Sequence, residues 1–177
     1  MRCFVGFFVP KAAKSGLLAL QEQLRKLPVD CKYVESENLH VCLSFLGEID
    51  EAAVTKAEAG LEAVCGEGSK FGLSAGCIKL IPSESYVRVI VLDVHDASGS
   101  LGRIAEGVKR RVGGDAKPPH ITLCRVRDIR DKPATVEKIK KIAFEKIEFD
   151  VDEISLIKSE LCAGGPKYSV VKGFRLK

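Results

Sequence analysis

Residues 39–43 read Leu-His-Val-Cys-Leu, and residues 119–123 read Pro-His-Ile-Thr-Leu. In both stretches a histidine is followed by a β-branched aliphatic residue, a small polar residue and a leucine, a composition that favours a β-strand. The two histidines are 80 residues apart (120 − 40), and a helical pattern begins about ten residues after each. This repetition predicts that the chain consists of two related halves.

Outward from these stretches, the hydrophobic periodicity predicts seven strands and four helices. The expected strands are Met1–Val9, Leu39–Leu46, Phe71–Ile81, Tyr86–Val94, His120–Val126, Lys146–Ser159 and Tyr168–Leu176. The expected helices are Lys11–Lys26, Glu51–Val64, Ser98–Val112 and one that begins after Pro133. The connections at 82–85 and 164–166 have the composition of hairpin turns. Mixed strands and helices with hairpins favour an α+β fold with antiparallel sheets over a doubly wound parallel sheet, and no glycine-rich phosphate loop is present.

Length and composition indicate one globular domain over residues 1–177. Hydrophobic residues make up 46% of the chain, which is enough for a packed core. The apolar stretch at residues 3–9 is too short to span a membrane, so we expect a cytoplasmic protein without a membrane partner. A net charge of +4 permits an anionic partner but does not by itself indicate nucleic-acid binding.

The seven cysteines favour neither a disulfide framework nor a metal site. Their number is odd, they form no Cys-x-x-Cys pair, and none has zinc-ligand spacing to a histidine. Most lie among apolar residues, where a reduced thiol behaves as a small buried hydrophobe. We therefore expect no metal and no cofactor.

Catalysis is suggested by the alternation of side chains along a strand. His40 and Cys42 share one face, as do His120 and Thr122, because side chains two residues apart point the same way. A histidine near its ordinary pKa can act as an acid or as a base near pH 7, so two of them can activate water and protonate a leaving group without a metal. A single strand histidine is more often structural, but the repeated context favours a catalytic pair. Small donors at Cys42 and Thr122 could hold phosphate oxygens.

Other polar residues carry weaker signals. His95 has no matching partner, and we expect a structural role for it. Arg125, Arg127 and Arg130 follow the second motif, where guanidinium groups could bind phosphate or simply form a solvated charged strip.

These features resemble the two-histidine phosphoesterase superfamily, specifically its RNA 2′,3′-cyclic phosphodiesterases, historically called 2′-5′ RNA ligases. The paired His-x-Thr-x motifs correspond to His40-Val41-Cys42-Leu43 and His120-Ile121-Thr122-Leu123, and the match covers nearly the whole chain. Further context comes from the segments Glu37-Asn38-Leu39 and Phe45-Leu46-Gly47, from Pro119, and from a Gly-Pro-x-Tyr turn ending at Tyr168.

The resemblance implies a bilobal, pseudo-symmetric fold with the active site in a central cleft. It implies that His40 donates a proton to the leaving ribose oxygen, that His120 activates water, and that the product is a 2′-phosphomonoester. It also implies that Arg125 contacts phosphate, although simple alternation puts Arg125 on the face opposite His120, so a bulge or strand twist is required. The expected partner is RNA with 2′,3′-cyclic phosphate ends, tRNA fragments among them, and the expected state is a monomer.

Two residues depart from the family pattern and keep alternatives open. Cys42 replaces threonine, and Ser44 replaces a residue that is basic in many members, which removes a phosphate contact on the catalytic face. A non-catalytic RNA-end or nucleotide binder, a cyclic phosphodiesterase acting on a small nucleotide, and reversible 2′-5′ ligation are the competing interpretations. Tyr33 and Phe45 could stack on a base, although core packing is the commoner role of such a Phe45.

Overall fold

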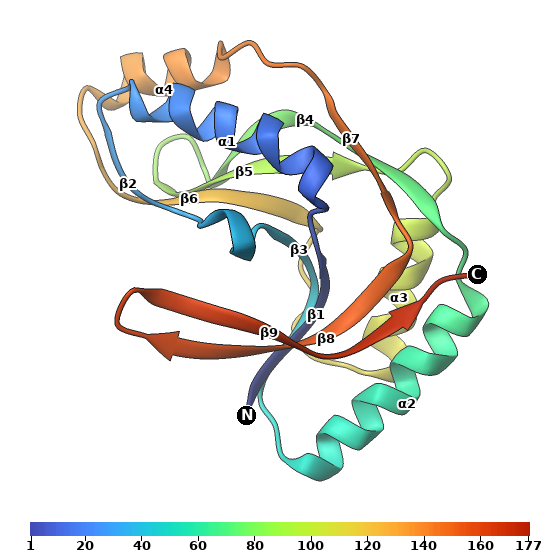
Figure 1. Cartoon of the computed structure of the whole chain (residues 1–177). Helices are drawn as coiled ribbons and strands as arrows, with labels where there is room; N and C mark the ends of the chain where they lie inside the picture. Colours follow the sequence, from blue (N-terminus) through green and yellow to red (C-terminus); the bar gives the residue numbers. More distant parts are fainter.

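The computed structural model describes residues 1–177 and contains four α-helices, one short 3₁₀ helix and nine strands (Figure 1). In chain order the elements are β1 (Arg2–Phe8), α1 (Lys11–Arg25), β2 (Val29–Tyr33), η1 (Ser36–Asn38), β3 (His40–Glu48), α2 (Glu51–Glu67), β4 (Phe71–Pro82), β5 (Val87–His95), α3 (Ser100–Arg111), β6 (His120–Ile129), α4 (Lys132–Lys140), β7 (Ile147–Val151), β8 (Glu153–Cys162) and β9 (Gly165–Arg175). The predicted α+β class is confirmed. None of the helices is both long enough and apolar enough to cross a membrane.

All strands belong to one antiparallel sheet that curls strongly and divides into two halves (Figure 1). The first-motif half has the order β3-β1-β8-β9, and the second-motif half has the order β6-β5-β4-β7, with β2 also paired to β6. The halves join where β3 meets β6, through the single pair Val41 and Ile121. These are the residues directly after the two histidines, so the join of the two halves lies within the repeated motifs.

The two halves repeat each other down to the register of their strands. In β1 and β3 the partners are Phe8–His40, Gly6–Cys42, Val5–Ser44 and Phe4–Phe45. In β5 and β6 they are Asp93–His120, Val91–Thr122, Ile90–Cys124 and Val89–Arg125. In both ladders the register shifts at the leucine that follows the small polar residue, so Leu43 and Leu123 are matching β-bulges. The predicted internal duplication therefore extends to an irregularity of the backbone.

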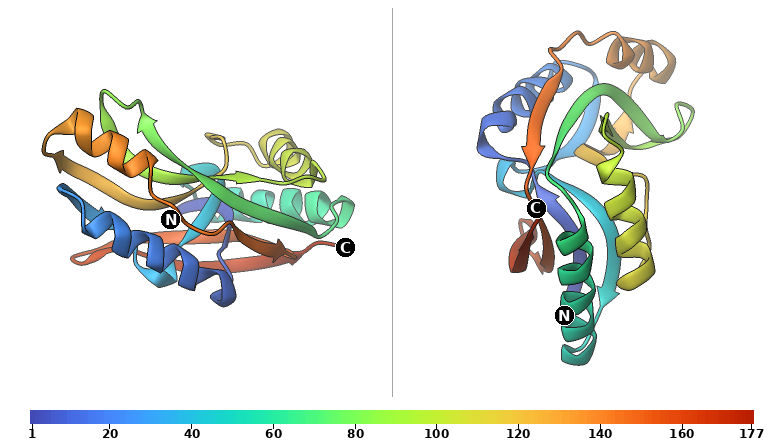
Figure 2. Two further views of the ribbon diagram at one scale, coloured as in Figure 1. Left: turned by 90° about the horizontal axis from the view of Figure 1, so that it is seen from above. Right: turned by 90° about the vertical axis from the view of Figure 1, so that its right-hand side faces the viewer.

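The halves also exchange elements. β4, from the first half of the chain, pairs with β5, and β8, from the second half, pairs with β1. Helix α1 packs against β7, β2 and β6, while α3 packs against α2 and β3. Thus α1 and α4 lie at one end of the molecule and α2 and α3 at the other (Figures 1 and 2).

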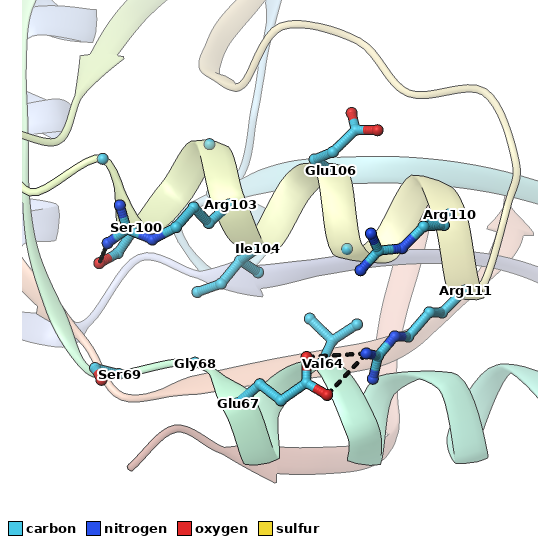
Figure 3. Close-up of a pocket in the computed structure, with 13 residues that line it drawn as sticks. Val64, Glu67, Gly68, Ser69, Ser100, Arg103, Ile104, Glu106, Arg110 and Arg111 are labelled. Carbon is cyan, nitrogen blue, oxygen red and sulfur yellow. Dashed lines mark hydrogen bonds and ion pairs between the residues drawn. The ribbon is translucent and has the colours of Figure 1, made fainter.

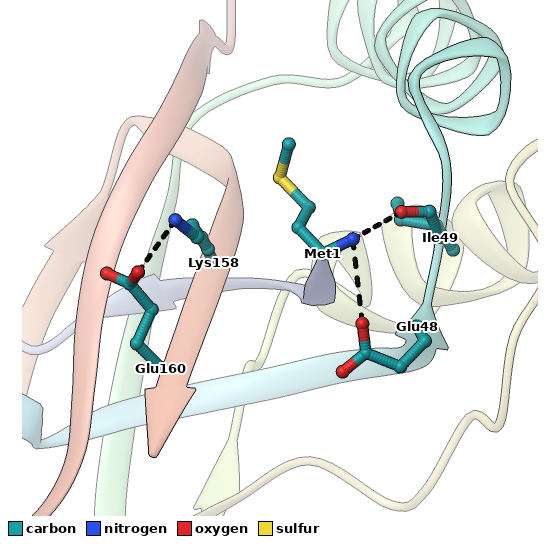
Figure 4. A network of polar contacts seen from close by, with 5 residues as sticks. All are labelled: Met1, Glu48, Ile49, Lys158 and Glu160. Atoms are coloured by element: carbon teal, nitrogen blue, oxygen red, sulfur yellow. Dashed lines mark hydrogen bonds and ion pairs between the residues drawn. The ribbon is translucent and has the colours of Figure 1, made fainter. Parts of the chain in front are cut away.

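One hydrophobic core of 36 buried residues spans both halves. Helix α1 contributes Leu17, Leu20 and Leu24, whose spacing places them on one side of the helix. At the end of β1 the amino group of Met1 donates to the Ile49 carbonyl at 2.6 Å and lies 3.5 Å from Glu48, which attaches this strand end to the end of β3 (Figure 4).

Two features of the predicted strand pattern were wrong. β2 was missed: it is only five residues long, and none of its residues is fully buried. The expected strand Lys146–Ser159 is two strands that break at Asp152, because β7 pairs with β4 while β8 pairs with β1. The segment changes sheet halves at that residue, and local sequence carries no record of such a change of partner.

The cysteines only partly match expectation. All seven are free, but only Cys3, Cys65 and Cys124 are buried. Cys77 is exposed because a register shift at Gly76 turns it away from the core-facing row of β4. The prediction that most thiols are buried was therefore wrong.

Candidate active site

His40 and His120 begin the two central strands and lie on the same face of the sheet, which we call the site face. In an antiparallel pair that centres on Val41 and Ile121, His40 stands beside Thr122, and Cys42 stands beside His120. The two histidines are then diagonal neighbours, for which Cβ atoms are typically about 7–8 Å apart. This spacing leaves room for one small group between the imidazoles, so the structure brings together all four predicted motif residues.

Both imidazoles are held by the same kind of hydrogen bond, from Nδ1 to a backbone carbonyl. Nδ1 of His40 lies 2.6 Å from the Asn38 carbonyl, and Nδ1 of His120 lies 2.8 Å from the Pro118 carbonyl. A carbonyl oxygen can only accept, so Nδ1 must carry the proton in each ring. Nε2 is therefore the reactive nitrogen on both sides, able to accept a proton when neutral and to donate one when charged.

The surroundings of His40 are aromatic. Its ring centroid lies 4.9 Å from that of Phe4 and 5.1 Å from that of Tyr168, which meets it edge-on at 78°. Burial lowers the pKa of His40, and the nearby positive charges of His120 and Arg125 lower it further, while the hydrogen bond to Asn38 raises it.

The β8–β9 hairpin braces the His40 side of the site. The buried Asn38 donates through Nδ2 to the Pro166 carbonyl at 2.9 Å, while its own carbonyl accepts from His40. Lys32 donates to the Gly164 carbonyl at 2.8 Å. The Gly-Pro-x-Tyr turn therefore supplies both an anchor for Asn38 and the Tyr168 ring against His40. We did not predict Tyr168 as a site residue; only its place in the family context pointed to it.

Cys42 and Thr122 are half-buried at matching positions of the site face. Burial raises the pKa of the Cys42 thiol to about 11. At neutral pH this side chain is consequently an uncharged, weakly donating thiol, which does not repel an anion.

Arg125 reaches the site face because of the bulge at Leu123. The extra residue makes Leu123 and Cys124 both face the core, so Arg125 returns to the face of Thr122. The Leu123 carbonyl accepts hydrogen bonds from Gln21 Nε2 at 2.9 Å and from the Val34 amide at 3.0 Å. Arg125 has no carboxylate within 4.0 Å. Burial raises the pKa of Tyr168, and the positive charge of Arg125 partly offsets this rise.

The other candidates lie elsewhere. Arg127 is 3.9 Å from Asp30, and Arg130 is exposed beyond the end of β6. The matching bulge at Leu43 turns Ser44 inward, where its hydroxyl donates to the Gly113 carbonyl at 2.6 Å. The expectation that Ser44 lies on the catalytic face was therefore wrong.

The structure also shows where Tyr33 and His95 lie. Tyr33 faces the core side, paired with Cys124 and covered by the Arg25 guanidinium at 3.9 Å, so it is not placed to stack on a base. His95 is at the exposed end of β5, apart from both motifs.

A pocket between α2 and α3 contains none of the predicted residues (Figure 3). Arg111 crosses its edge and donates to both carboxylate oxygens of Glu67, at 2.7 and 2.9 Å, which neutralises its charge. No group of three or more metal-ligating side chains is assembled anywhere in the chain.

Comparison with known proteins agrees with this geometry. The family model described as "LigT like Phosphoesterase" matches the chain twice, over residues 7–91 and 92–168, and each match contains one histidine motif. The chain is 30% identical over 187 residues to the RNA 2′,3′-cyclic phosphodiesterase of Aquifex aeolicus, which covers 99% of this chain and 97% of the relative. It is 31% identical over 188 residues to the enzyme of the same name from Methanocaldococcus jannaschii, covering 97% and 99% respectively.

Solved structures share the fold over nearly the full length. The crystal structure of TT0787 of Thermus thermophilus has a TM-score of 0.81 at 24% identity and covers 99% of this chain and 98% of its own. The structure of E. coli LigT with 3′-AMP has a TM-score of 0.76 at 19% identity and covers 99% and 97%. The predicted family is confirmed, because the family model matches most of the chain and both motifs: this protein belongs to the LigT-like phosphoesterases.

Proposed function

We propose that this phosphoesterase hydrolyses 2′,3′-cyclic phosphate ends of RNA, tRNA fragments among them, to 2′-phosphomonoesters without a metal ion. The observation that carries the proposal is the pair of histidines on one face, each with Nδ1 held by a carbonyl and Nε2 left for proton transfer. The names of the relatives from Aquifex and Methanocaldococcus support the same substrate class.

The reaction requires one proton acceptor and one proton donor. Water attacks phosphorus, and its proton passes to Nε2 of His120; the bond from phosphorus to the 3′-oxygen breaks, and that oxygen takes the proton of Nε2 of His40. The products are a 2′-phosphate and a 3′-hydroxyl. Each general acid or base contribution is typically about 10²–10⁴-fold.

Arg125, Thr122 and Cys42 are suited to hold the non-bridging phosphate oxygens. A guanidinium can form two parallel hydrogen bonds to phosphate, and Arg125 has no carboxylate partner that would compete. The hydroxyl of Thr122 and the protonated thiol of Cys42 add neutral donors on the two sides of the phosphate.

Ligation of 2′-5′ ends follows from the same geometry with a different nucleophile. A 5′-hydroxyl replaces water as the nucleophile, His120 accepts its proton, and the 3′-hydroxyl is again the leaving group. Because water is in large excess, hydrolysis is the favoured outcome, and ligation is expected only at high concentrations of the second RNA end.

The test uses an oligonucleotide that ends in a 2′,3′-cyclic phosphate, with and without a chelator. Wild-type protein is expected to form only the 2′-phosphomonoester at the same rate in both, and His40→Ala and His120→Ala are expected to lose most of the activity. Activity that needs metal, or that survives both substitutions, contradicts the mechanism. Binding of the oligonucleotide without turnover supports the non-catalytic alternative instead.

A substrate with sulfur in place of the 3′-oxygen separates the two roles. A thiolate leaves without protonation because thiols are far more acidic than alcohols. His40→Ala should therefore be rescued on this substrate, whereas His120→Ala should not. Rescue of His120→Ala instead would reverse the assignment.

Arg125→Gln tests the phosphate contact and has a matched control. We expect a kcat loss of about 10²-fold or more, the size typical for one stabilising donor. Arg110→Gln, on α3 beside the pocket of Figure 3, removes the same charge outside the site and should leave kcat unchanged. Equal effects of the two substitutions would mean that only net charge matters.

A further inference from the structure

The side of the site next to His120 is where the nucleophile must lie. In an in-line displacement the attacking and the leaving oxygens are on opposite sides of phosphorus, and in the proposed reaction His120 takes the proton of the attacking oxygen. Water and the 5′-hydroxyl of a second RNA compete for this place, but only the second RNA brings negatively charged phosphates with it. The charges around His120 therefore decide which of the two can react.

Two carboxylates flank His120 on the site face. Asp93 of β5 is in register with His120, so the two side chains point the same way. Asp115, in the loop before β6, is in register with Phe45, which the bulge at Leu43 returns to the site face. Two backbone hydrogen bonds, of 3.0 and 2.9 Å, hold Asp115 and Phe45 together. An anionic strand that approaches His120 thus meets a carboxylate from β5 and another from this loop.

The lysines near His120 are paired with these carboxylates. Nζ of Lys79, in β4, lies 2.6 Å from Asp93, and Nζ of Lys117 lies 3.0 Å from Asp115. Both pairs are exposed to solvent, so they add little to the stability of the fold. Their consequence is electrostatic: neither lysine is free to bind a phosphate, and the local charge is close to zero.

The cations on the opposite side of the site face are free of carboxylates. Arg125, beyond Thr122 on β6, has no carboxylate within 4.0 Å. Lys32, its register partner on β2, donates to the Gly164 carbonyl at 2.8 Å and forms no ion pair. The site face is therefore positive where the cyclic phosphate end would bind and neutral where the nucleophile would enter.

We infer that Asp93 and Asp115 determine the specificity of the reaction for water over a second RNA end. Each neutralises a lysine that would otherwise bind a phosphate of the incoming strand, and each carboxylate repels that strand, whereas water is uncharged. The inference rests on the proposed function, because it takes His120 as the group that activates the nucleophile. The two aspartates act on the approach of the nucleophile and not on the proton transfers.

The test measures how one cyclic phosphate end is divided between two products. An oligonucleotide ending in 2′,3′-cyclic phosphate is incubated with a second one that carries a 5′-hydroxyl, and the 2′-5′ joined product is compared with the 2′-phosphomonoester. Asp93→Asn and Asp115→Asn each free one lysine, so each should raise the ratio of ligation to hydrolysis by about tenfold, the size typical of one charge-assisted hydrogen bond. Any effect on His120 itself cancels in this ratio, because both reactions need the same base.

Glu67→Gln is the matched control. Glu67 accepts two hydrogen bonds from Arg111 in the pocket between α2 and α3, so its replacement also removes one negative charge and frees one cation, but away from the site (Figure 3). Its ratio should stay at the wild-type value, and the rise in the aspartate variants should shrink at high salt. An unchanged ratio in both aspartate variants, an equal rise in Glu67→Gln, or a rise that high salt leaves unaltered would overturn the inference.

A binding measurement separates this inference from the proposed function. Fluorescence anisotropy of a labelled oligonucleotide with a 5′-hydroxyl requires no turnover. Asp93→Asn and Asp115→Asn should each bind it more tightly than Glu67→Gln does, although all three variants have the same net charge. If no cyclic phosphate is hydrolysed, the proposed function fails, but this difference in affinity still decides whether the aspartates exclude an RNA strand. Equal affinities of the three variants would contradict it.

Discussion

His40 and His120 each make the same kind of hydrogen bond through Nδ1 but are packed in different surroundings. Each Nδ1 is bound to the carbonyl of the residue two positions earlier, yet only His40 is enclosed by aromatic rings. Identical backbone with different packing is a simple way to separate the proton affinities of two groups of one type. The duplication thus supplies two histidines, and burial lowers the pKa of His40.

The lowered pKa of His40 predicts the pH dependence of the reaction. In the proposed mechanism His40 donates a proton and must therefore be charged, and burial lowers its pKa in the free enzyme below the ordinary value of 6.5. The charged fraction falls as pH rises through that pKa, so kcat/KM should decline on the alkaline side from below 6.5. The bound phosphate anion favours the charged imidazole, so the same limb in kcat should lie at higher pH.

Steady-state rates across pH check this directly. Each limb reports a pKa of the coupled pair of histidines and not of one histidine alone. An alkaline limb of kcat/KM at or above the ordinary histidine pKa would assign the proton donor to another group.

Replacing the thiol of Cys42 with a hydroxyl should not lower kcat and could raise it modestly. Cys42→Thr replaces a weak donor with a stronger one at the position that matches Thr122. We expect kcat on a cyclic phosphate end to rise or to stay unchanged. Thr122→Cys, which installs the thiol on the other strand, should lower kcat, and a large loss in Cys42→Thr would show that the thiol has a role of its own.

At the level of elements, the site depends on two matching bulges. In both strands the histidine and the residue two positions later lie on the site face, and the next two residues are buried. The residue after the bulge then lies on the site face again: Phe45 in β3 and Arg125 in β6. A regular strand would turn these last residues to the core face. Next to the bulge at Leu43, β3 lies so close to Gly6 that a side chain there would collide with the Val41 carbonyl.

Gly6→Ala should therefore be destabilising. Its Cβ has no flexible side chain to displace, only backbone, so we expect a loss of about 1–3 kcal/mol in the free energy of unfolding. Activity should fall as well, because the displaced backbone carries Cys42 and adjoins His40. Urea unfolding followed by circular dichroism measures the first effect, and turnover of the cyclic phosphate the second.

Gly66→Ala in α2 is the control for this substitution. A Cβ at Gly66 meets no atom within 4 Å, so the change should be neutral or stabilising by up to about 1 kcal/mol. If both alanine variants behaved alike, the close approach at Gly6 would carry no energetic weight.

At the level of the whole molecule, the exchange of strands and helices predicts that the two halves unfold together. Each half of the sheet contains strands from both halves of the chain, and one core spans them. We propose on this basis that residues 1–177 form a single domain. Neither half can retain its core when the other opens, so unfolding should be two-state.

Two tyrosines make this testable, because the chain contains no tryptophan. Tyr33 lies in β2 of the second-motif half and Tyr168 in β9 of the first-motif half. The third tyrosine, Tyr86, is removed in both variants. Fluorescence of Tyr33→Phe/Tyr86→Phe and of Tyr86→Phe/Tyr168→Phe, each normalised to that variant's own circular dichroism curve, should give coincident transitions. Different midpoints for fluorescence and circular dichroism in either variant would contradict a single cooperative unit.

Sequence alone determined the α+β class, nearly all the helices and strands, the duplication and the histidine pair. Strand and helix periodicity depends on neighbouring residues, and a spacing of 80 residues between two similar motifs is visible without any structure. The tertiary structure decided the break at Asp152, the inward turn of Ser44, the outward turns of Cys77 and Arg125, and the packing of aromatic rings around His40. Each of these depends on which strand lies alongside and in which register, and that pairing joins residues far apart in the chain, so no local pattern could carry it.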